Sequence, residues 1–113
     1  MIRIYHNPRC RKSREGLAIL EASGKEFEII KYLDDQLTAE QLREVLSKLN
    51  IKPIDLVRKN EAIWKSDYKG KTLSDKQIID AMVAHPKLIE RPIVINKKKA
   101  VVGRPPESIL NII

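Results

Sequence analysis

Residues 2–32 are IRIYHNPRCRKSREGLAILEASGKEFEIIKY, and this stretch decides the fold class. Residues 2–5 alternate apolar and polar side chains with a β-branched bias, which predicts a β-strand. Residues 6–9 include asparagine and proline, which favour a turn. A helical spacing of apolar side chains follows over residues 10–23, and Gly24 is well placed to end that helix.

A second strand is predicted at residues 27–32, so the chain opens with a βαβ unit. The two strands of such a unit are parallel, and its crossover is right-handed. Near the other end of the chain, the apolar residues 93–95 and 100–102 flank a lysine-rich turn, which indicates a β-hairpin. After two prolines, Ile109 and its apolar neighbours predict a final short helix.

The middle of the chain has the pattern of a helical segment. Thr38 with Gln41 and Ser74 with Gln77 form capping boxes, and apolar residues at helical spacing follow each of them. A leading βαβ unit, a helical insertion at about 36–87 and a trailing ββα unit describe a small α/β sheet with helices on its faces. This order of elements matches a thioredoxin-like fold with an inserted helical segment.

Length and composition indicate a globular protein without a membrane span. Residues 1–113 have the usual size of a single domain, with 42% hydrophobic and 33% charged residues. No apolar run approaches the roughly 20 residues of a transmembrane helix, and the first residues lack the apolar region of a secretory signal. We therefore expect one domain in a cytosolic protein, with a monomer as the default.

The net charge of +7 is compatible with two kinds of partner. A basic surface attracts nucleic acid, and it can also steer small anions into a site. The densest cluster, Lys97, Lys98 and Lys99, is explained by solvated lysines at a hairpin tip. Aromatic residues make up only 4% of the chain, which argues against a base-stacking surface and a nucleic-acid partner.

Cys10 is the single cysteine of the chain. One thiol cannot form an internal disulfide, a CxxC redox centre or a structural zinc site with several thiolates. Any thiol that regenerates Cys10 must come from outside the chain.

Cys10 is predicted to be a nucleophile because it falls where a strand ends and a helix begins. Unpaired backbone N–H groups and the helix dipole at that place stabilise a thiolate. Arg9 and Arg11 flank the thiol and His6 lies four residues before it. Basic neighbours of this kind lower the pKa of a cysteine. The alternative is a small buried hydrophobic residue, which the polar and basic surroundings disfavour.

Two nearby residues, His6 and Ser13, are further candidates for the catalytic site, and each has two interpretations. His6 could tune the thiolate or orient a substrate oxygen, or it could be a strand-end histidine bonded to the backbone. Ser13 gives a CxxS arrangement, in which the hydroxyl could hydrogen-bond the thiolate but could not form a disulfide with it. It could also be an ordinary serine in the first helical turn.

Three arginines stand out by their context: Arg58, Arg91 and Arg104. A guanidinium group presents paired donors that match an oxyanion, and it stays charged near the interior. Taken singly, each of these arginines is better explained as a surface salt bridge. Their spacing in the sequence does not show whether they converge on one site.

Three separated motifs resemble those of the arsenate reductase family that works with glutathione and glutaredoxin. The motifs are HNPRCRKSR at residues 6–14, IERPIV at residues 89–94 and GRPPE at residues 103–107. The likeness covers essentially the whole chain. It implies a thioredoxin-like fold with a helical insertion and a cis peptide bond before Pro92.

The resemblance also implies a role for each site residue. Cys10 matches the nucleophile of the family, and His6 matches the histidine thought to influence its thiolate. Arg58, Arg91 and Arg104 match the three arginines that hold arsenate. Arsenate or a similar oxyanion would then be the substrate, glutathione would add as the second thiol, and glutaredoxin would resolve the Cys10–glutathione link. Because both electrons come from thiols, this chemistry needs no metal or flavin.

The sequence departs from the family pattern at Arg11, where a small residue is common, and over residues 65–73. The bulk and charge of Arg11 could alter the fit of the substrate. Two other functions remain open. The protein could be a glutathione-dependent reductase of mixed disulfides, or an Spx-like regulator that binds RNA polymerase without catalysis. Such regulators commonly carry a second cysteine where this chain has Ser13.

Overall fold

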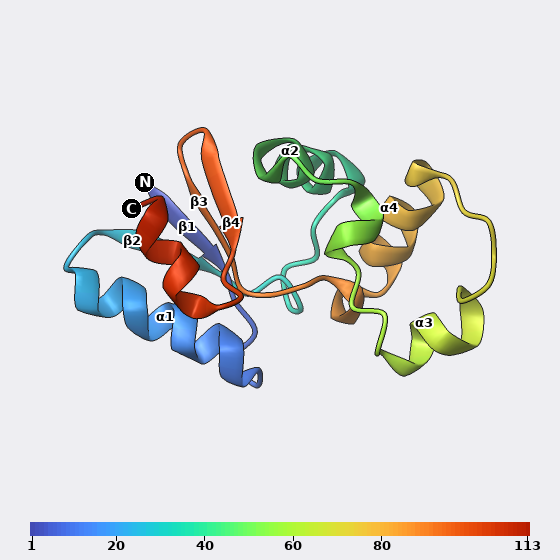
Figure 1. Ribbon diagram of the computed structural model, residues 1–113, viewed down its shortest axis with the longest axis horizontal. Helices are drawn as coiled ribbons and strands as arrows, with labels where there is room; N and C mark the ends of the chain where they lie inside the picture. The colour runs from blue at the N-terminus through green and yellow to red at the C-terminus, as the bar shows by residue number, and fades with distance from the viewer. The chain divides into compact units, whose positions relative to one another are not determined.

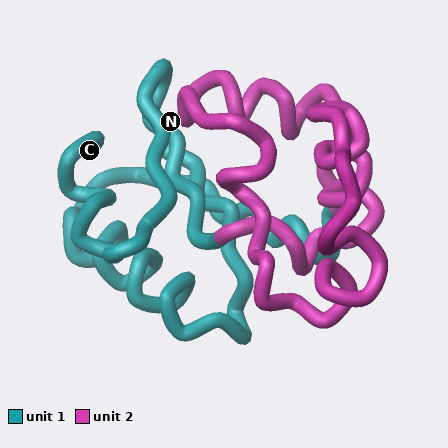
Figure 2. The backbone as a smooth tube through the Cα atoms, turned by 45° about the vertical axis from the view of Figure 1, so that its right-hand side comes forward, with its two compact units in different colours: residues 1–35, 91–113 teal, residues 36–90 magenta.

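The computed structural model describes residues 1–113, which form two compact units (Figure 2). One unit comprises residues Met1–Asp35 and Arg91–Ile113, and the other comprises residues Gln36–Glu90. The second unit lies close to the range of about 36–87 that we expected for the helical insertion. That the two units make up a single domain stays a prediction. No helix in the structure combines the length and the apolar character needed to cross a membrane.

The first unit is built on a four-stranded sheet with the strand order β2-β1-β3-β4. Its strands are β1 (Ile2–Tyr5), β2 (Phe27–Ile30), β3 (Ile93–Asn96) and β4 (Lys99–Val102), and its helix is α1 (Arg11–Ser23). β1 pairs with β2 in parallel and with β3 in the antiparallel direction, and β3 and β4 form an antiparallel hairpin. The βαβ unit and the hairpin predicted from the sequence are both confirmed (Figure 1).

Helix α1 and the 3-10 helix Pro106–Asn111 pack on the sheet through a shared apolar cluster (Figure 1). The cluster consists of the buried side chains of Ile2, Ile4, Leu20, Val94 and Ile109. Full burial of one such side chain stabilises a fold by about 1.5–3 kcal/mol. The cluster therefore holds α1 in a fixed place on the sheet, and with it the residues at the start of the helix.

Helix α1 begins after Cys10 and ends before Gly24, as predicted. Cys10 has extended backbone angles (φ −94°, ψ 124°), and its carbonyl accepts the first helical hydrogen bond from the N–H of Arg14 at 3.0 Å. Gly24 has a φ of 72°, a left-handed conformation that glycine adopts without steric cost. The thiol of Cys10 is thus carried by the N-cap of α1, next to backbone N–H groups that have no partner within the helix.

Helix α1 makes a close contact through Gly16. A Cβ atom at this position would lie 2.7 Å from Cγ of Pro92 and 3.0 Å from Cδ1 of Ile109. Gly103 faces the same two side chains, and the corresponding distances are 2.8 and 3.1 Å. Pro92 can pack so closely only because both positions lack a side chain. This packing fixes the position of the preceding residue, Arg91, relative to α1.

The second unit is helical. It contains α2 (Ala39–Leu49), α3 (Ala62–Asp67) and α4 (Asp75–Ala84), with short 3-10 helices at Pro53–Leu56 and Pro86–Leu88. Both predicted capping boxes, at Thr38 and at Ser74, are present. In each, the hydroxyl of the N-cap residue accepts from the N–H of a glutamine three residues later, and the glutamine side chain accepts from the N-cap N–H.

Two details differ from the predictions. The second strand ends at Ile30 rather than at residue 32. The chain turns there because the carbonyl of Lys31 accepts hydrogen bonds from the N–H groups of Asp34 and Asp35, at 3.0 and 2.9 Å. The short helix α3 was not predicted from the sequence.

We expect Gly16→Ala to lower the free energy of unfolding by about 1–3 kcal/mol, because the added methyl group must displace Pro92 or Ile109. Urea denaturation followed by circular dichroism measures this change. At an exposed helical position, alanine is instead favoured over glycine by about 0.5–1 kcal/mol. Ala18→Gly is the matched control, because it exchanges the same two residue types at an exposed position of the same helix and so measures the helical preference alone. A Gly16→Ala variant more stable than the wild type would contradict the packing.

Candidate active site

The half-buried sulfur of Cys10 receives hydrogen bonds from the start of α1. The backbone N–H groups of Lys12 and Ser13 are directed at it. The N–H of Cys10 itself donates to the carbonyl of Asn7 at 3.0 Å, which closes the turn between β1 and α1. This is the arrangement in which the positive end of a helix favours an anion.

Two guanidinium groups, both distant from Cys10 in the sequence, reach its sulfur. The side chain of Arg91 hydrogen-bonds the thiol, and Nη2 of Arg104 lies 4.0 Å from Sγ. Nε of Arg104 also donates to the carbonyl of Arg91 at 3.0 Å, so the two arginines are connected. The cis peptide bond expected before Pro92 is present, and the bond between Arg104 and Pro105 is cis as well.

These surroundings act in opposite directions on the pKa of Cys10. Burial is the largest effect, and it raises the pKa because a buried thiolate loses hydration. The backbone N–H of Ser13, the hydrogen bond and positive charge of Arg91, and the backbone N–H of Lys12 lower the pKa. Their combined effect exceeds that of burial, so the pKa of Cys10 is lowered and the thiolate is favoured.

The arginines next to Cys10 in the sequence are directed elsewhere. Nε of Arg11 lies 3.1 Å from Oε1 of Glu15, and the side chain of Arg11 is 85% exposed. Arg9 is exposed as well. The positive charge that acts on the thiol is therefore that of Arg91, together with the helix N-terminus, rather than that of the sequence neighbours.

His6 and Ser13 form a buried hydrogen-bonded pair. Nδ1 of His6 lies 2.7 Å from Oγ of Ser13, and the same hydroxyl accepts from the backbone N–H of Asn7 at 2.9 Å. The hydroxyl can donate its hydrogen to Nδ1 or accept a second bond from Nδ1–H, and only the first arrangement puts the proton of a neutral imidazole on Nε2. The hydroxyl of Ser13 makes no hydrogen bond to the sulfur; this residue acts on Cys10 through its backbone N–H.

The pKa of His6 is lowered, chiefly because burial disfavours the charged ring. A hydrogen bond with Ser13 raises it. The positive charges of Lys31 and Arg14 lower it further, and the negative charge of Glu21 raises it. The net shift favours the neutral ring.

Arg58 lies in the other unit, residues 36–90. Its Nε is 3.7 Å from Oε1 of Glu61, and its backbone N–H donates to the carbonyl of Leu88 at 2.7 Å. The salt bridge that single-residue reasoning favoured is therefore present. Nη1 of Arg58 has no hydrogen-bond partner. The role of Arg58 in binding an oxyanion stays a prediction.

Two residues that shape the site, Asn7 and Gly16, were not predicted from the sequence. Asn7 is buried, and its side-chain Oδ1 accepts from the N–H of Arg9 at 3.0 Å while its backbone binds Ser13 and Cys10. Asparagine before proline signalled a turn but not these bonds. Gly16 allows the close approach of the segment that carries Arg91, and a glycine inside a predicted helix is the signal that could have identified it.

No group of three or more His, Cys, Asp or Glu side chains is arranged to hold a metal ion. Fold and site together define an α/β protein with a parallel βαβ unit, a β-hairpin and one cysteine at a helix N-terminus, beside two arginines.

Comparison with known proteins places the chain in a family. A sequence model of the ArsC family matches residues 5–112. The arsenate reductase of Haemophilus influenzae is 43% identical over 112 residues, which cover 97% of this chain and 97% of that protein. The uncharacterized protein YfgD of Escherichia coli is 44% identical over 114 residues, which cover 99% of this chain and 96% of that protein.

A solved structure shows the same fold. The arsenate reductase from Vibrio cholerae superposes with a TM-score of 0.94 at 43% identity, covering 99% of this chain and 97% of that chain. The protein therefore belongs to the ArsC family. The thioredoxin-like fold and the family resemblance inferred from the sequence are confirmed.

We expect the free energy of unfolding to fall as the pH drops through about 6.5, because the unfolded chain binds a proton at His6 more readily than the folded chain does. The contribution of His6 to stability is complete above the unfolded pKa, which is about 6.5, and is lost toward the lower folded pKa. Urea denaturation near neutral pH and about one unit below pH 6.5 measures this loss.

The matched variants are His6→Gln and His85→Gln, each of which removes one of the two histidines. The acid-induced loss should shrink in His6→Gln and persist in His85→Gln. If His6→Gln loses as much stability as the wild type, His6 is not the group whose protonation destabilises the fold.

Proposed function

We propose that this protein is a thiol-dependent arsenate reductase in which the Cys10 thiolate is the nucleophile. The observation that carries the proposal is the placement of Arg91 and Arg104 at the sulfur. The same positive charges that favour the thiolate attract a doubly charged oxyanion to it. The names of the relatives from Haemophilus influenzae and Vibrio cholerae add support for arsenate as the substrate.

The two arginines suit different parts of this task. Arg91 is buried, with 8% of its surface exposed, and its side chain hydrogen-bonds the sulfur of Cys10. Arg104 is exposed, so its guanidinium can meet an incoming anion. Paired N–H donors match the oxygens of arsenate, and charge-assisted hydrogen bonds of this kind are about twice as strong as neutral ones. As arsenic is attacked, both groups stabilise the charge that develops on its oxygens.

In the first step, the thiolate of Cys10 attacks arsenic and forms a sulfur–arsenic bond. One arsenate oxygen takes up a proton from solvent and leaves as hydroxide or water. Arsenic stays in the +5 state, so no electron has yet been transferred. The lowered pKa of Cys10 supplies the ionised sulfur that this attack needs.

The reducing step needs a second thiol, and the chain has none because Cys10 is its single cysteine. We propose glutathione for this step. Its sulfur attacks the sulfur of Cys10, a disulfide forms, and the electron pair of the sulfur–arsenic bond passes to arsenic. Arsenic then leaves in the +3 state as arsenite. Two thiols have been oxidised to one disulfide, which balances the two electrons gained by arsenic.

The remaining disulfide between Cys10 and glutathione must be reduced before another cycle. We propose glutaredoxin as the external protein that attacks it, which returns the Cys10 thiol and binds the glutathione in a new disulfide. Because such a cycle needs thiols that are kept reduced, we propose that the protein acts in the cytosol. No bound cofactor takes part in any step.

Two other arginines bear on the substrate. We propose that Arg58 has the role that the resemblance implies, that of a third ligand to arsenate. Arg11 departs from the family pattern, but its side chain is exposed and paired with Glu15. Its bulk and charge are therefore directed away from the sulfur, and we expect little effect of Arg11 on arsenate binding.

We expect Cys10→Ser to lower arsenate reduction by roughly 10³-fold or more, because a serine hydroxyl is not ionised at neutral pH and cannot form the disulfide. The assay follows arsenite formation with glutathione and glutaredoxin supplied. Lys99→Gln, which removes a charge at the hairpin tip, is the control and should keep the wild-type rate. Reduction that continues in Cys10→Ser would rule out this mechanism.

The same assay separates the alternatives. Thioredoxin in place of glutaredoxin tests the identity of the reductant, and a glutathionylated disulfide in place of arsenate tests the disulfide-reductase function. Turnover of that disulfide without turnover of arsenate would favour the disulfide reductase. Capture of RNA polymerase with no thiol-dependent turnover of any oxyanion would favour an Spx-like regulator.

A further inference from the structure

A cavity of about 260 Å³ adjoins the loop that carries Cys10. Its wall is formed by two segments of the first unit, the end of β1 with the following turn and the turn after β2. The lining residues are His6, Asn7, Pro8, Arg9, Lys31, Leu33 and Asp34. Cys10 itself does not line the cavity, but Arg9 directly precedes it, so a molecule held in this cavity lies against the loop that carries Cys10.

His6 brings a buried imidazole ring to this cavity. The ring is 4% exposed and lines the wall, and its Nδ1 is bonded to Ser13. Nε2 makes no hydrogen bond within the protein, and it is a donor in the tautomer that accepts the Ser13 hydroxyl hydrogen at Nδ1. A buried ring with one nitrogen fixed and the other unpartnered is suited to bind an acceptor atom of a ligand.

The other side chains of the cavity combine both signs of charge. Arg9 and Lys31 are cationic, Asp34 is anionic, and none of the three forms an ion pair within the protein. Leu33, which is 37% exposed, adds an apolar surface beside them. A simple anion would leave Asp34 opposed to it, whereas a ligand with a carboxylate and an ammonium group has a partner for each charge.

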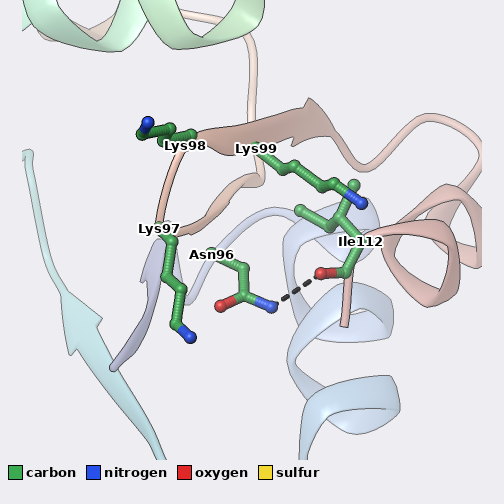
Figure 3. A pocket seen from close by; sticks show the side chains of 5 residues that line it. All are labelled: Asn96, Lys97, Lys98, Lys99 and Ile112. Atoms are coloured by element: carbon green, nitrogen blue, oxygen red, sulfur yellow. Dashed lines mark hydrogen bonds between the residues drawn. The ribbon is translucent and has the colours of Figure 1, made fainter.

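The larger cavity of the first unit, about 420 Å³ at the β3–β4 hairpin, lacks these properties (Figure 3). Its three lysine side chains, Lys97, Lys98 and Lys99, point in different directions (Figure 3). The amide of Asn96 is already bonded to the carbonyl of Ile112 at 2.7 Å. No carboxylate side chain lines this cavity, so it has no group to bind an ammonium.

We propose that the cavity beside Cys10 binds the α-amino-acid end of the thiol co-substrate. Its carboxylate is bound by Lys31 or Arg9 and by Nε2–H of His6, and its ammonium group by Asp34. A volume of about 260 Å³ is below the usual range of about 300–1,000 Å³ for drug-sized ligands, which suits one end of a peptide rather than all of it. The γ-glutamyl end of glutathione has this chemistry.

The inference rests on the proposed function, since it names the binding site for the thiol of that reaction. It is tested without turnover by titrating the wild-type protein with S-methylglutathione, which keeps the charged groups but has no free thiol. Backbone amide shifts measured by nuclear magnetic resonance should move at residues 31–34. Lys31→Gln and Asp34→Asn should each weaken binding about two- to five-fold, the range of an exposed ion pair.

Lys99→Gln is the matched control, since it removes a charge from the other cavity, and it should bind S-methylglutathione as the wild type does. The inference is overturned if the ligand does not bind, if the shifts lie at residues 96–99 instead, or if the two cavity variants bind like the control.

The two proposals fail separately. Binding at residues 31–34 in a protein that does not reduce arsenate would leave this inference standing and remove the proposed function. The opposite outcome is that the protein reduces arsenate with glutathione, while Lys31→Gln and Asp34→Asn leave its affinity for S-methylglutathione unchanged. That result would support the proposed function and overturn this inference.

Discussion

The close packing of Pro92 against Gly16 and Gly103 is the constraint on which the site depends. A Cβ atom at either glycine would come within 2.8 Å of the proline ring, so the contact exists only because both positions lack a side chain. Through it, the segment before β3 is held against helix α1, and Arg91 is brought to the sulfur of Cys10. Arg104 is then held through its hydrogen bond to the carbonyl of Arg91.

The electrostatics of the site follow from that packing. A half-buried thiol next to a sheet would normally stay protonated, because burial disfavours its charged form. Here the N–H groups at the start of α1 and the guanidinium of Arg91 outweigh burial. The site therefore contains an anion-stabilising helix end and two arginines around one sulfur. These groups favour the thiolate before the substrate binds and can neutralise an oxyanion when it arrives.

Much of the fold could be predicted from local patterns. The βαβ unit, the hairpin and the capped helices each depend on residues close together in the sequence, such as Thr38 with Gln41. The short helix α3 was missed because its six residues have no capping box or long apolar face. The early end of β2 depends on backbone bonds to the carbonyl of Lys31, which side-chain patterns do not specify.

The site was predictable in part. The place of Cys10 at the start of a helix followed from its neighbours, but the contact with Arg91 joins residues distant in sequence and was implied only by the resemblance. The positive charge at the thiol was predicted to come from Arg9 and Arg11, but Arg9 is exposed and Arg11 pairs with Glu15. The hydrogen bond of Ser13 could not be predicted either, because a serine in the first turn has several backbone and side-chain partners within reach.

The most direct test of this account is the pH titration of the Cys10 thiolate by its ultraviolet absorbance in the wild type, in Arg91→Gln and in Arg11→Gln. The account predicts a wild-type pKa below the ordinary value of about 8.5, a higher pKa in Arg91→Gln and no change in Arg11→Gln. A wild-type pKa at or above the ordinary value, or equal shifts in the two variants, would contradict it.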